Sequence, residues 1–190
     1  MKINLFIYLL FINFVMSESI KEPDYKVISS YGNIEVREYS EHLIAKTSIP
    51  YNPDKENNNM FRTLAGYIFG GNSKNESIPM TAPVITRNNN NNYEMIFFML
   101  NADTIDQLPL PNDEKVNIEV MNLSTTISIQ FGMWATDDRV KHYKEILDEF
   151  IKKNDIIIKS NLMIAQYNSP WALPPFRKNE LLYTIDYEKN

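Results

Sequence analysis

The stretch Ala165-Gln166-Tyr167-Asn168-Ser169-Pro170-Trp171-Ala172-Leu173-Pro174-Pro175-Phe176-Arg177-Lys178-Asn179-Glu180 lies between two strand-like runs near the end of the chain. Its three prolines hold the backbone extended, and each removes a backbone donor, so this stretch cannot simply join a sheet. We therefore interpret residues 165–180 as a loop, with Glu180 as an ion-paired anchor beside Arg177 and Lys178. The loop presents Trp171, Leu173 and Phe176 next to these two cations, which suits a flat apolar molecule with acidic edges.

The composition is that of one soluble globular domain. The chain has 190 residues, 44% hydrophobic and 23% charged, enough for a full core. A net charge of −5 and the lack of a basic patch argue against nucleic-acid binding. The five glycines form no phosphate-binding loop, and the absence of cysteine excludes thiolate catalysis and thiolate metal sites.

The N-terminus is typical of a secretory signal peptide. Met1-Lys2 precedes an apolar run from Ile3 to Met16, which is shorter than the roughly 20 residues that span a bilayer. Val15 and Ser17 fit a cleavage site after Ser17, so we expect a signal peptide over 1–17 and one domain over 18–190. A retained membrane anchor is the alternative. Secretion or residence in an endomembrane lumen would make Asn75 and Asn122, each in an Asn-x-Ser sequon, candidate glycosylation sites.

The apolar periodicity predicts an α+β domain made of two similar halves. In the first half, strands are expected over 25–33, 34–39, 43–49, 80–87 and 93–100, with a helix over 57–69 that stops at Gly70-Gly71. In the second half, strands are expected over 116–120, 125–131, 162–167 and 181–187, with a helix over 137–154. Asn88–Asn92 would form a hairpin loop. Each half follows a strand–strand–helix–strand–strand pattern, which predicts two pseudo-symmetric halves in a strongly bent antiparallel sheet or barrel with two helices.

The two helices differ in their apolar surface. The helix over 137–154 has one apolar stripe and is an ordinary packing helix. In the helix over 57–69, Phe61, Leu64 and neighbouring residues make a core face, and Met60 and Tyr67 extend it sideways. An apolar flank needs a second cover. Either a loop of the chain packs on it, or it forms one wall of a ligand cleft.

No catalytic constellation is found. His142 falls on the polar face of the second helix, and His42 follows Glu41 at the start of a strand, where a surface position is the simpler interpretation. Neither has the further ligands that a zinc site needs. No serine lies in a nucleophile-elbow context, and no carboxylate pair occupies an apolar setting. Binding is better supported, and Pro79-Met80-Thr81-Ala82-Pro83-Val84 would form a rigid strand entry, or a turn bordering the cleft.

These segments together resemble the SOUL haem-binding protein family, from about Tyr25 to Tyr187. The resemblance is carried by Tyr25–Ile28, Ile34–Tyr39, Phe61, Leu64, Tyr67-Ile68, Gly70–Asn72, Ile78–Val84, Leu108-Pro109, Pro111, Phe131-Gly132, Ala165–Asn168, Pro170-Trp171 and Arg177–Glu180. It implies two pseudo-symmetric halves forming a distorted β-barrel flanked by two helices. It also implies non-covalent binding of haem or another porphyrin in a shallow apolar groove, along the first helix and near the late loop.

The chain departs from the family at its charged positions. Glu38 stands where a histidine is the proposed axial iron ligand in one branch, and His42, four residues on, is a candidate substitute, although nothing in the spacing requires it. Asn58 and Leu173 stand where another branch has basic residues near the propionates. Arg62, Arg177 and Lys178 are the available replacements.

We therefore expect a non-enzymatic, monomeric haem or tetrapyrrole binder, acting as a carrier or buffer. Its porphyrin face would comprise Met60, Leu64, Tyr67, Trp171 and Phe176. Arg62, Arg177 or Lys178 would meet the propionates. The alternative is a protein- or membrane-interaction module that uses the exposed aromatic loop.

Overall fold

The computed structural model describes residues 20–51, 58–169 and 171–187. The expected signal peptide over 1–17 lies outside these residues. The strands are β1 (Tyr25–Tyr31), β2 (Ile34–Tyr39), β3 (Glu41–Pro50), β4 (Val84–Asn89), β5 (Asn92–Phe98), β6 (Asn117–Asn122), β7 (Thr125–Phe131), β8 (Ile157–Ile158), β9 (Met163–Gln166) and β10 (Asn179–Asp186). The helices are α1 (Asn58–Ile68) and α2 (Asp137–Lys153), with short 3-10 turns η1 (Ile105–Gln107) and η2 (Pro174–Phe176). Within the described residues, neither helix has the length and apolar content needed to cross a bilayer.

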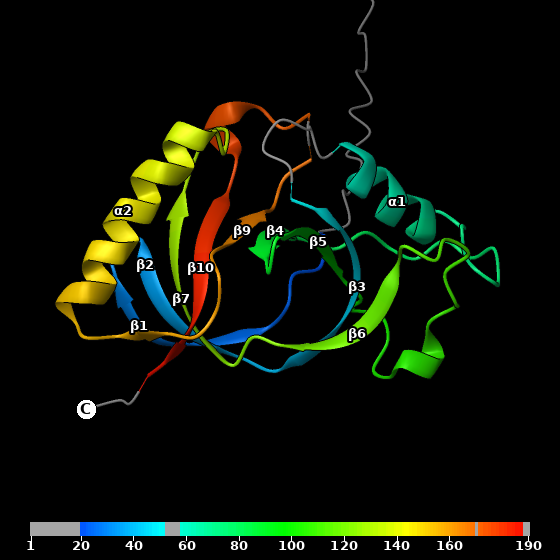
Figure 1. Ribbon diagram of the computed structural model, residues 1–190, viewed down its shortest axis with the longest axis horizontal. Coiled ribbons are helices and arrows are strands. Elements are labelled where there is room, and N and C mark those ends of the chain that lie inside the picture. Colours follow the sequence, from blue (N-terminus) through cyan, green and yellow to red (C-terminus); the bar gives the residue numbers. More distant parts are fainter. Residues whose placement is uncertain (1–19, 52–57, 170, 188–190) are drawn as a thin grey trace, which may run out of the picture.

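The strands form one curled antiparallel sheet that makes a half-barrel (Figure 1). The predicted α+β architecture, a strongly bent antiparallel sheet with two helices, is confirmed. The strand order is β1-β2-β7-β10-β9-β4-β5-β3-β6. The order is symmetric about the β9–β4 pair, so that β2, β3, α1, β4 and β5 match β6, β7, α2, β9 and β10. The first strand of each half pairs with the other half, because β2 lies beside β7 and β6 lies beside β3. This exchange joins the halves into one sheet.

Each helix covers one end of the sheet. α1 packs on β3 and β5, and α2 packs on β7 and β10 (Figure 1). Side chains alternate across a strand, so the opposite face of the same strands points into the curl. Three clusters of buried apolar residues result, one under α1, one under α2 and one inside the curl.

Most element boundaries agree with those expected, and the differences have local causes. β4 begins at Val84 rather than Met80, because Pro79 and Pro83 cannot donate to a ladder. The asparagine hairpin loop is shorter than predicted, since only Asn90 and Asn91 form the turn, both with positive φ. β10 begins at Asn179, so the proline-rich connection comprises residues 167–178 and is called the late loop below.

Both helices end in the same way. A residue with positive φ follows the cap residue, and the next N–H donates to the carbonyl five residues back: Gly71 N to Gly66 O at 2.8 Å, and Ile156 N to Ile151 O at 3.1 Å. This is a Schellman arrangement, in which glycine is preferred at the positive-φ position. α1 has Gly70 there (φ 103°), whereas α2 has Asp155 (φ 52°).

Candidate functional site

The predicted flank of α1 is not open. Met60 and Tyr67 are 1% and 2% exposed, and Leu64 is fully buried, all in the cluster against β3 and β5. The Tyr67 hydroxyl donates to Pro109 O at 2.9 Å, and burial raises the pKa of Tyr67 to about 12. The prediction that Met60 and Tyr67 form an uncovered wall is therefore wrong, because the connection between β5 and β6 covers this side of the helix.

A shallow depression remains beside Tyr67 at the surface of α1. Its volume is about 370 Å³, and it is lined by Arg62, Thr63, Gly66, Tyr67, Gly71, Asn112 and Asp113. A Cβ on Gly71 would lie 2.6 Å from Gly66 O, so the close approach of these two backbones requires glycine. Arg62 is exposed and forms no ion pair with another described residue.

Phe61 is also on the exposed side of α1. The pattern predicts it in the core face, but the side chain is 40% exposed and touches Phe97 only edge-on, with ring centroids 5.6 Å apart. α1 is therefore rotated relative to the prediction. Its open surface carries Phe61 and Arg62, while Met60, Leu64 and Tyr67 face inward.

The late loop presents its apolar side chains to solvent. Trp171 is 92% exposed and Phe176 is 76% exposed, and Leu173 is also exposed. Pro174 opens η2, where a missing N–H costs no helical bond. The predicted exposure of this aromatic loop is therefore observed.

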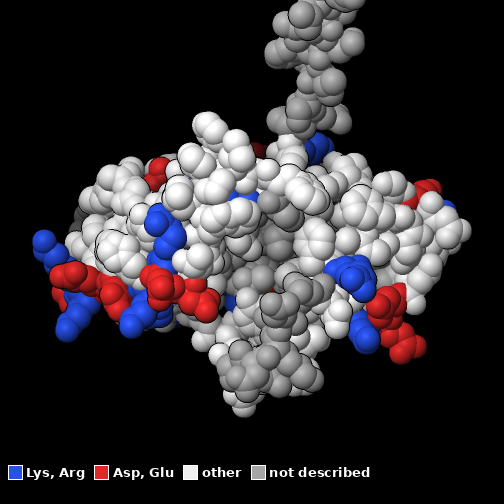
Figure 2. All heavy atoms as spheres, turned by 90° about the horizontal axis from the view of Figure 1, so that it is seen from above, with Lys and Arg blue, Asp and Glu red and all other residues white. Residues whose placement is uncertain are grey.

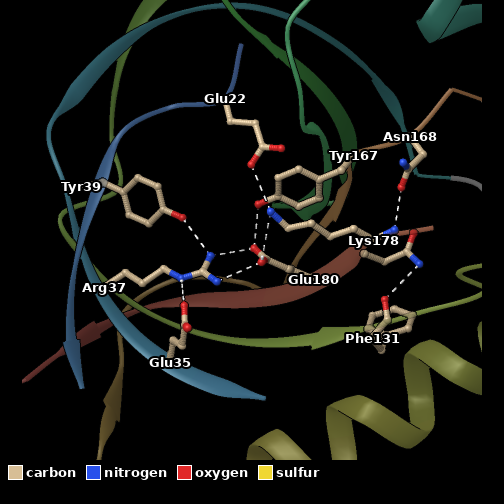
Figure 3. Close-up of polar contacts among 10 residues, drawn as sticks. Glu22, Glu35, Arg37, Tyr39, Phe131, Tyr167, Asn168, Lys178 and Glu180 are labelled. Carbon is tan, nitrogen blue, oxygen red and sulfur yellow. Dashed lines mark hydrogen bonds and ion pairs between the residues drawn. The ribbon is translucent and has the colours of Figure 1, made fainter. Parts of the chain in front are cut away.

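The two cations of the late loop, Arg177 and Lys178, contact other residues of the chain. Arg177 is buried, with its guanidinium 3.8 Å from the centroid of Trp134, and it donates to Ser169 O and Ala172 O, both at 3.1 Å. Lys178 Nζ lies 3.7 Å from the centroid of Tyr167 and 3.0 Å from a Glu22 carboxylate oxygen (Figure 3). Both side chains therefore have partners within the chain that a ligand carboxylate would have to displace.

His42 lies on the face of the sheet opposite α1. Its ring contacts Phe98 edge-on at 5.7 Å, and the aligned pair Ile44 and Phe98 points into the curl, whereas Leu43 and Ala45 point toward α1. The structure does not bring His42 to the surface that carries Arg62 and Phe61. No cluster of three potential metal-ligating side chains occurs among the described residues.

A buried polar network inside the curl was missed by the sequence interpretation. Arg37 of β2 donates to both Glu180 oxygens, at 2.8 and 2.9 Å, and to Glu35 and the Tyr39 hydroxyl (Figure 3). The Tyr167 hydroxyl donates to Glu180 at 2.7 Å. Glu180 is fully buried in β10, so the prediction that it anchors the loop beside Arg177 and Lys178 is corrected: its main partner is Arg37, 143 positions away, and Lys178 reaches it only at 4.0 Å.

Burial and charge set the ionisation of this network. Burial raises the pKa of Tyr39 to about 12, although nearby Arg37 opposes the shift. Burial, reinforced by Glu180, also raises the pKa of Tyr167 well above its ordinary range. Burial alone would lower the pKa of Arg37, but Glu180 and Tyr39 outweigh this effect and raise it. All three side chains therefore keep their protons across the physiological range, and the network acts as a permanent cross-link between β2 and β10.

A sequence signal for this network exists. In Ile34-Glu35-Val36-Arg37-Glu38-Tyr39, Glu35, Arg37 and Tyr39 share one strand face. In a sheet covered on both faces, a buried cation requires a carboxylate partner. Which carboxylate it is depends on the sheet order, and this order is not visible in the local pattern.

The charged side chains that share a face with the late loop and the start of α1 lie mainly at its two ends. Figure 2 shows charged side chains of the described residues over the α2 side and over the α1 side of this face. Among the described residues, no hydrogen bond or ion pair links α1 to the late loop. Both sequon asparagines are exposed, although Asn122 Nδ2 also donates to Glu41 at 3.1 Å.

Comparison with known proteins identifies the family. The SOUL heme-binding protein family model matches residues 20–184. The chain belongs to the SOUL heme-binding protein family. A comparison with proteins of curated function gave no match.

Solved structures share the fold at low identity. An uncharacterised conserved protein from Listeria innocua matches with a TM-score of 0.61 at 9% identity, covering 81% of this chain and 92% of that one. A structure described as a hydrolase from Listeria innocua matches with a TM-score of 0.58 at 9% identity, covering 84% and 94%. The EcmrR C-terminal domain matches with a TM-score of 0.60 at 10% identity, covering 85% and 98%. At such identities the likeness concerns the fold alone, so the hydrolase description says nothing of this chain's activity.

Proposed function

We propose that the chain binds haem or a related tetrapyrrole without catalysing a reaction, in a secreted or endomembrane setting. Membership of the SOUL family is the observation that carries this proposal. The exposed residues Phe61, Trp171 and Phe176 supply apolar surface for a macrocycle. Burying such surface contributes roughly 25 cal/mol per Å² before the costs of association, which is enough for a weak, shallow site.

The burial of Met60, Leu64 and Tyr67 changes how the predicted site would work. These three residues would support the α1 surface from below rather than contact the macrocycle. Phe61 and the shallow depression beside Tyr67 would receive one edge of the ring, and Trp171 with Phe176 would cover part of its face. Haem would bind this surface through its apolar ring. His42, which lies on the opposite face of the sheet, would not ligate the iron.

Arg62 is the strongest candidate for a propionate partner. It borders the depression and has no ion-pair partner among the described residues. A guanidinium matches a carboxylate through two parallel hydrogen bonds. Arg177 and Lys178 would instead keep the late loop in the shape that exposes Trp171.

A titration of the full chain with haemin and with iron-free protoporphyrin tests this function. Wild-type protein should bind both with affinities within about threefold, since apolar contact carries the binding. Trp171→Ala with Phe176→Ala should weaken both, and Val27→Ala, which removes an exposed apolar side chain from β1, should weaken neither. A porphyrin affinity unchanged in the double variant would refute the proposed surface.

The exposure of Trp171 also favours a second function, that of a protein- or membrane-interaction module. A large aromatic side chain that is almost fully exposed is unusual on an isolated domain. Flotation with phosphatidylcholine vesicles, using Trp171→Ala as control, separates the two functions. Vesicle binding that depends on Trp171, in a chain that fails to bind porphyrin, would support the second function.

A further inference from the structure

A second cavity lies at the C-terminal end of α2, in the other half of the molecule. Its volume is about 650 Å³, within the range of small-molecule sites. Its lining includes the aromatic residues Tyr31, Phe150 and Tyr187, the acidic residues Asp155 and Asp186, and Ile156. The rings of Tyr31 and Phe150 lie 5.1 Å apart at an angle of 49°, so they form a corner.

The charge of this cavity has one sign. Among the residues that the structure describes, two acidic residues line it and no lysine or arginine does. Lys159 contacts Asp186 at 3.1 Å from outside the lining, but both side chains are more than half exposed, and such pairs contribute little. The carboxylate of Asp155 has no hydrogen bond or ion pair to another described residue.

Asp155 occupies the positive-φ position of a Schellman arrangement, where the equivalent residue of α1 is Gly70. An aspartate in this conformation is less stable than a glycine. Asp155 lines the cavity, so a carboxyl-bearing side chain stands here where the first half has none.

We propose that this cavity binds an organic cation with an apolar body, of the substituted-ammonium class. Aromatic faces attract a positive charge through their quadrupole, and the two carboxylates add Coulombic attraction. Ile156 and the aromatic rings accommodate the apolar part. An anionic porphyrin would be repelled by the same carboxylates, so this site is independent of the surface proposed for haem.

The test titrates the full chain with phenyltrimethylammonium and, separately, with its neutral isostere tert-butylbenzene. Binding is monitored through the backbone amide NMR shifts at constant ionic strength. The cation should produce saturable shifts around residues 154–157 and 186–187. Asp155→Gly should bind it about fivefold more weakly, with an unchanged or raised Tm because glycine suits this backbone. Asp155→Asn, which keeps the side-chain shape, should show the same loss.

Three results would overturn the proposal. The first is an absence of saturable shifts at these residues up to about 10 mM probe. The second is an equal response to tert-butylbenzene, since charge would then play no part. The third is an Asp155→Gly variant that binds the cation as tightly as the wild type.

Discussion

The two halves of this molecule share a backbone plan but differ where their helices end. α1 ends on Gly70-Gly71, and its C-terminal turn is packed closely against its own backbone at Gly66. α2 ends on Asn154-Asp155, which leaves a carboxylate beside a larger cavity. The pseudo-symmetry therefore repeats the path of the chain without repeating the chemistry of its surfaces. Function has to be sought in each half separately.

What the halves do share is the interior of the curl. Arg37 comes from a strand of the first half and Glu180 from a strand of the second. Because both side chains are buried, neither can be solvated if its partner is lost. An arrangement of the sheet that separated β2 from β10 would leave both groups buried without a partner, so the ion pair favours the observed position of β2.

The largest expected effect comes from breaking this cross-link. Arg37→Met alone should reduce the free energy of unfolding by about 3–5 kcal/mol, because the buried Glu180 carboxyl loses its ion-pair partner. Arg37→Met with Glu180→Leu should recover most of the loss. Urea denaturation of the two single variants and the double variant measures the coupling. Additive losses in the double variant would mean that the two residues act independently.

The helix ends give opposite changes in the two halves. Gly71→Ala should destabilise the fold by about 1–3 kcal/mol, because the new Cβ would lie 2.6 Å from a carbonyl oxygen. Asp155→Gly should stabilise it by up to about 1 kcal/mol, because glycine relieves a left-handed backbone. Thermal denaturation of both variants under the same conditions checks the signs. A destabilised Asp155→Gly would show that its carboxylate makes a structural contact.

The first half should also respond to acid through Glu94. Burial alone would raise the pKa of Glu94, but hydrogen bonds and charge from Arg87, with help from Asn89 and Lys46, lower it below the ordinary 4.5. A carboxyl with a lowered folded pKa contributes stability that is present above its unfolded pKa and is lost as pH falls through the folded pKa. Glu94→Gln should thus cost about 1 kcal/mol at pH 7, with a smaller cost at pH 3. A pH-independent cost, measured by urea denaturation, would contradict this ion-pair account.

The smallest expected effect on stability is at the late loop. Trp171→Ala should change the free energy of unfolding by less than about 0.5 kcal/mol, because the side chain is almost wholly exposed. Trp134→Ala provides the matched control, since its ring packs on the Arg177 guanidinium 3.8 Å away. The control should be the more destabilised of the two in thermal denaturation, and a reversed order would show that Trp171 is packed in solution.

The sequence predicts the positions of the helices and strands better than it predicts which side of each element is buried. Strand and helix positions follow from local periodicity, and the two-half pattern predicts the sheet. The orientation of α1 was misjudged because Phe61 and Met60 are both apolar, and only the β5–β6 connection decides which one is covered. Arg37 and Glu180 could not be paired, because their proximity depends on β2 lying across β7 from β10.

The candidate site shows the same division. The exposed residues of the late loop were predicted from its prolines, since a segment that cannot enter a sheet stays at the surface. Arg177 and Lys178 were expected to face a ligand, but they contact Trp134 and Tyr167 instead. Such cation–ring contacts depend on the fold, and sequence spacing does not show them.

The exposed apolar surface formed by Phe61 of α1 and by the late loop is proposed to bind a tetrapyrrole. The most direct measurement is a titration of the wild-type chain with haemin, followed at the Soret band. We expect a saturable spectral change with a midpoint in the micromolar range. The proposal fails if the spectrum does not change at tens of micromolar haemin.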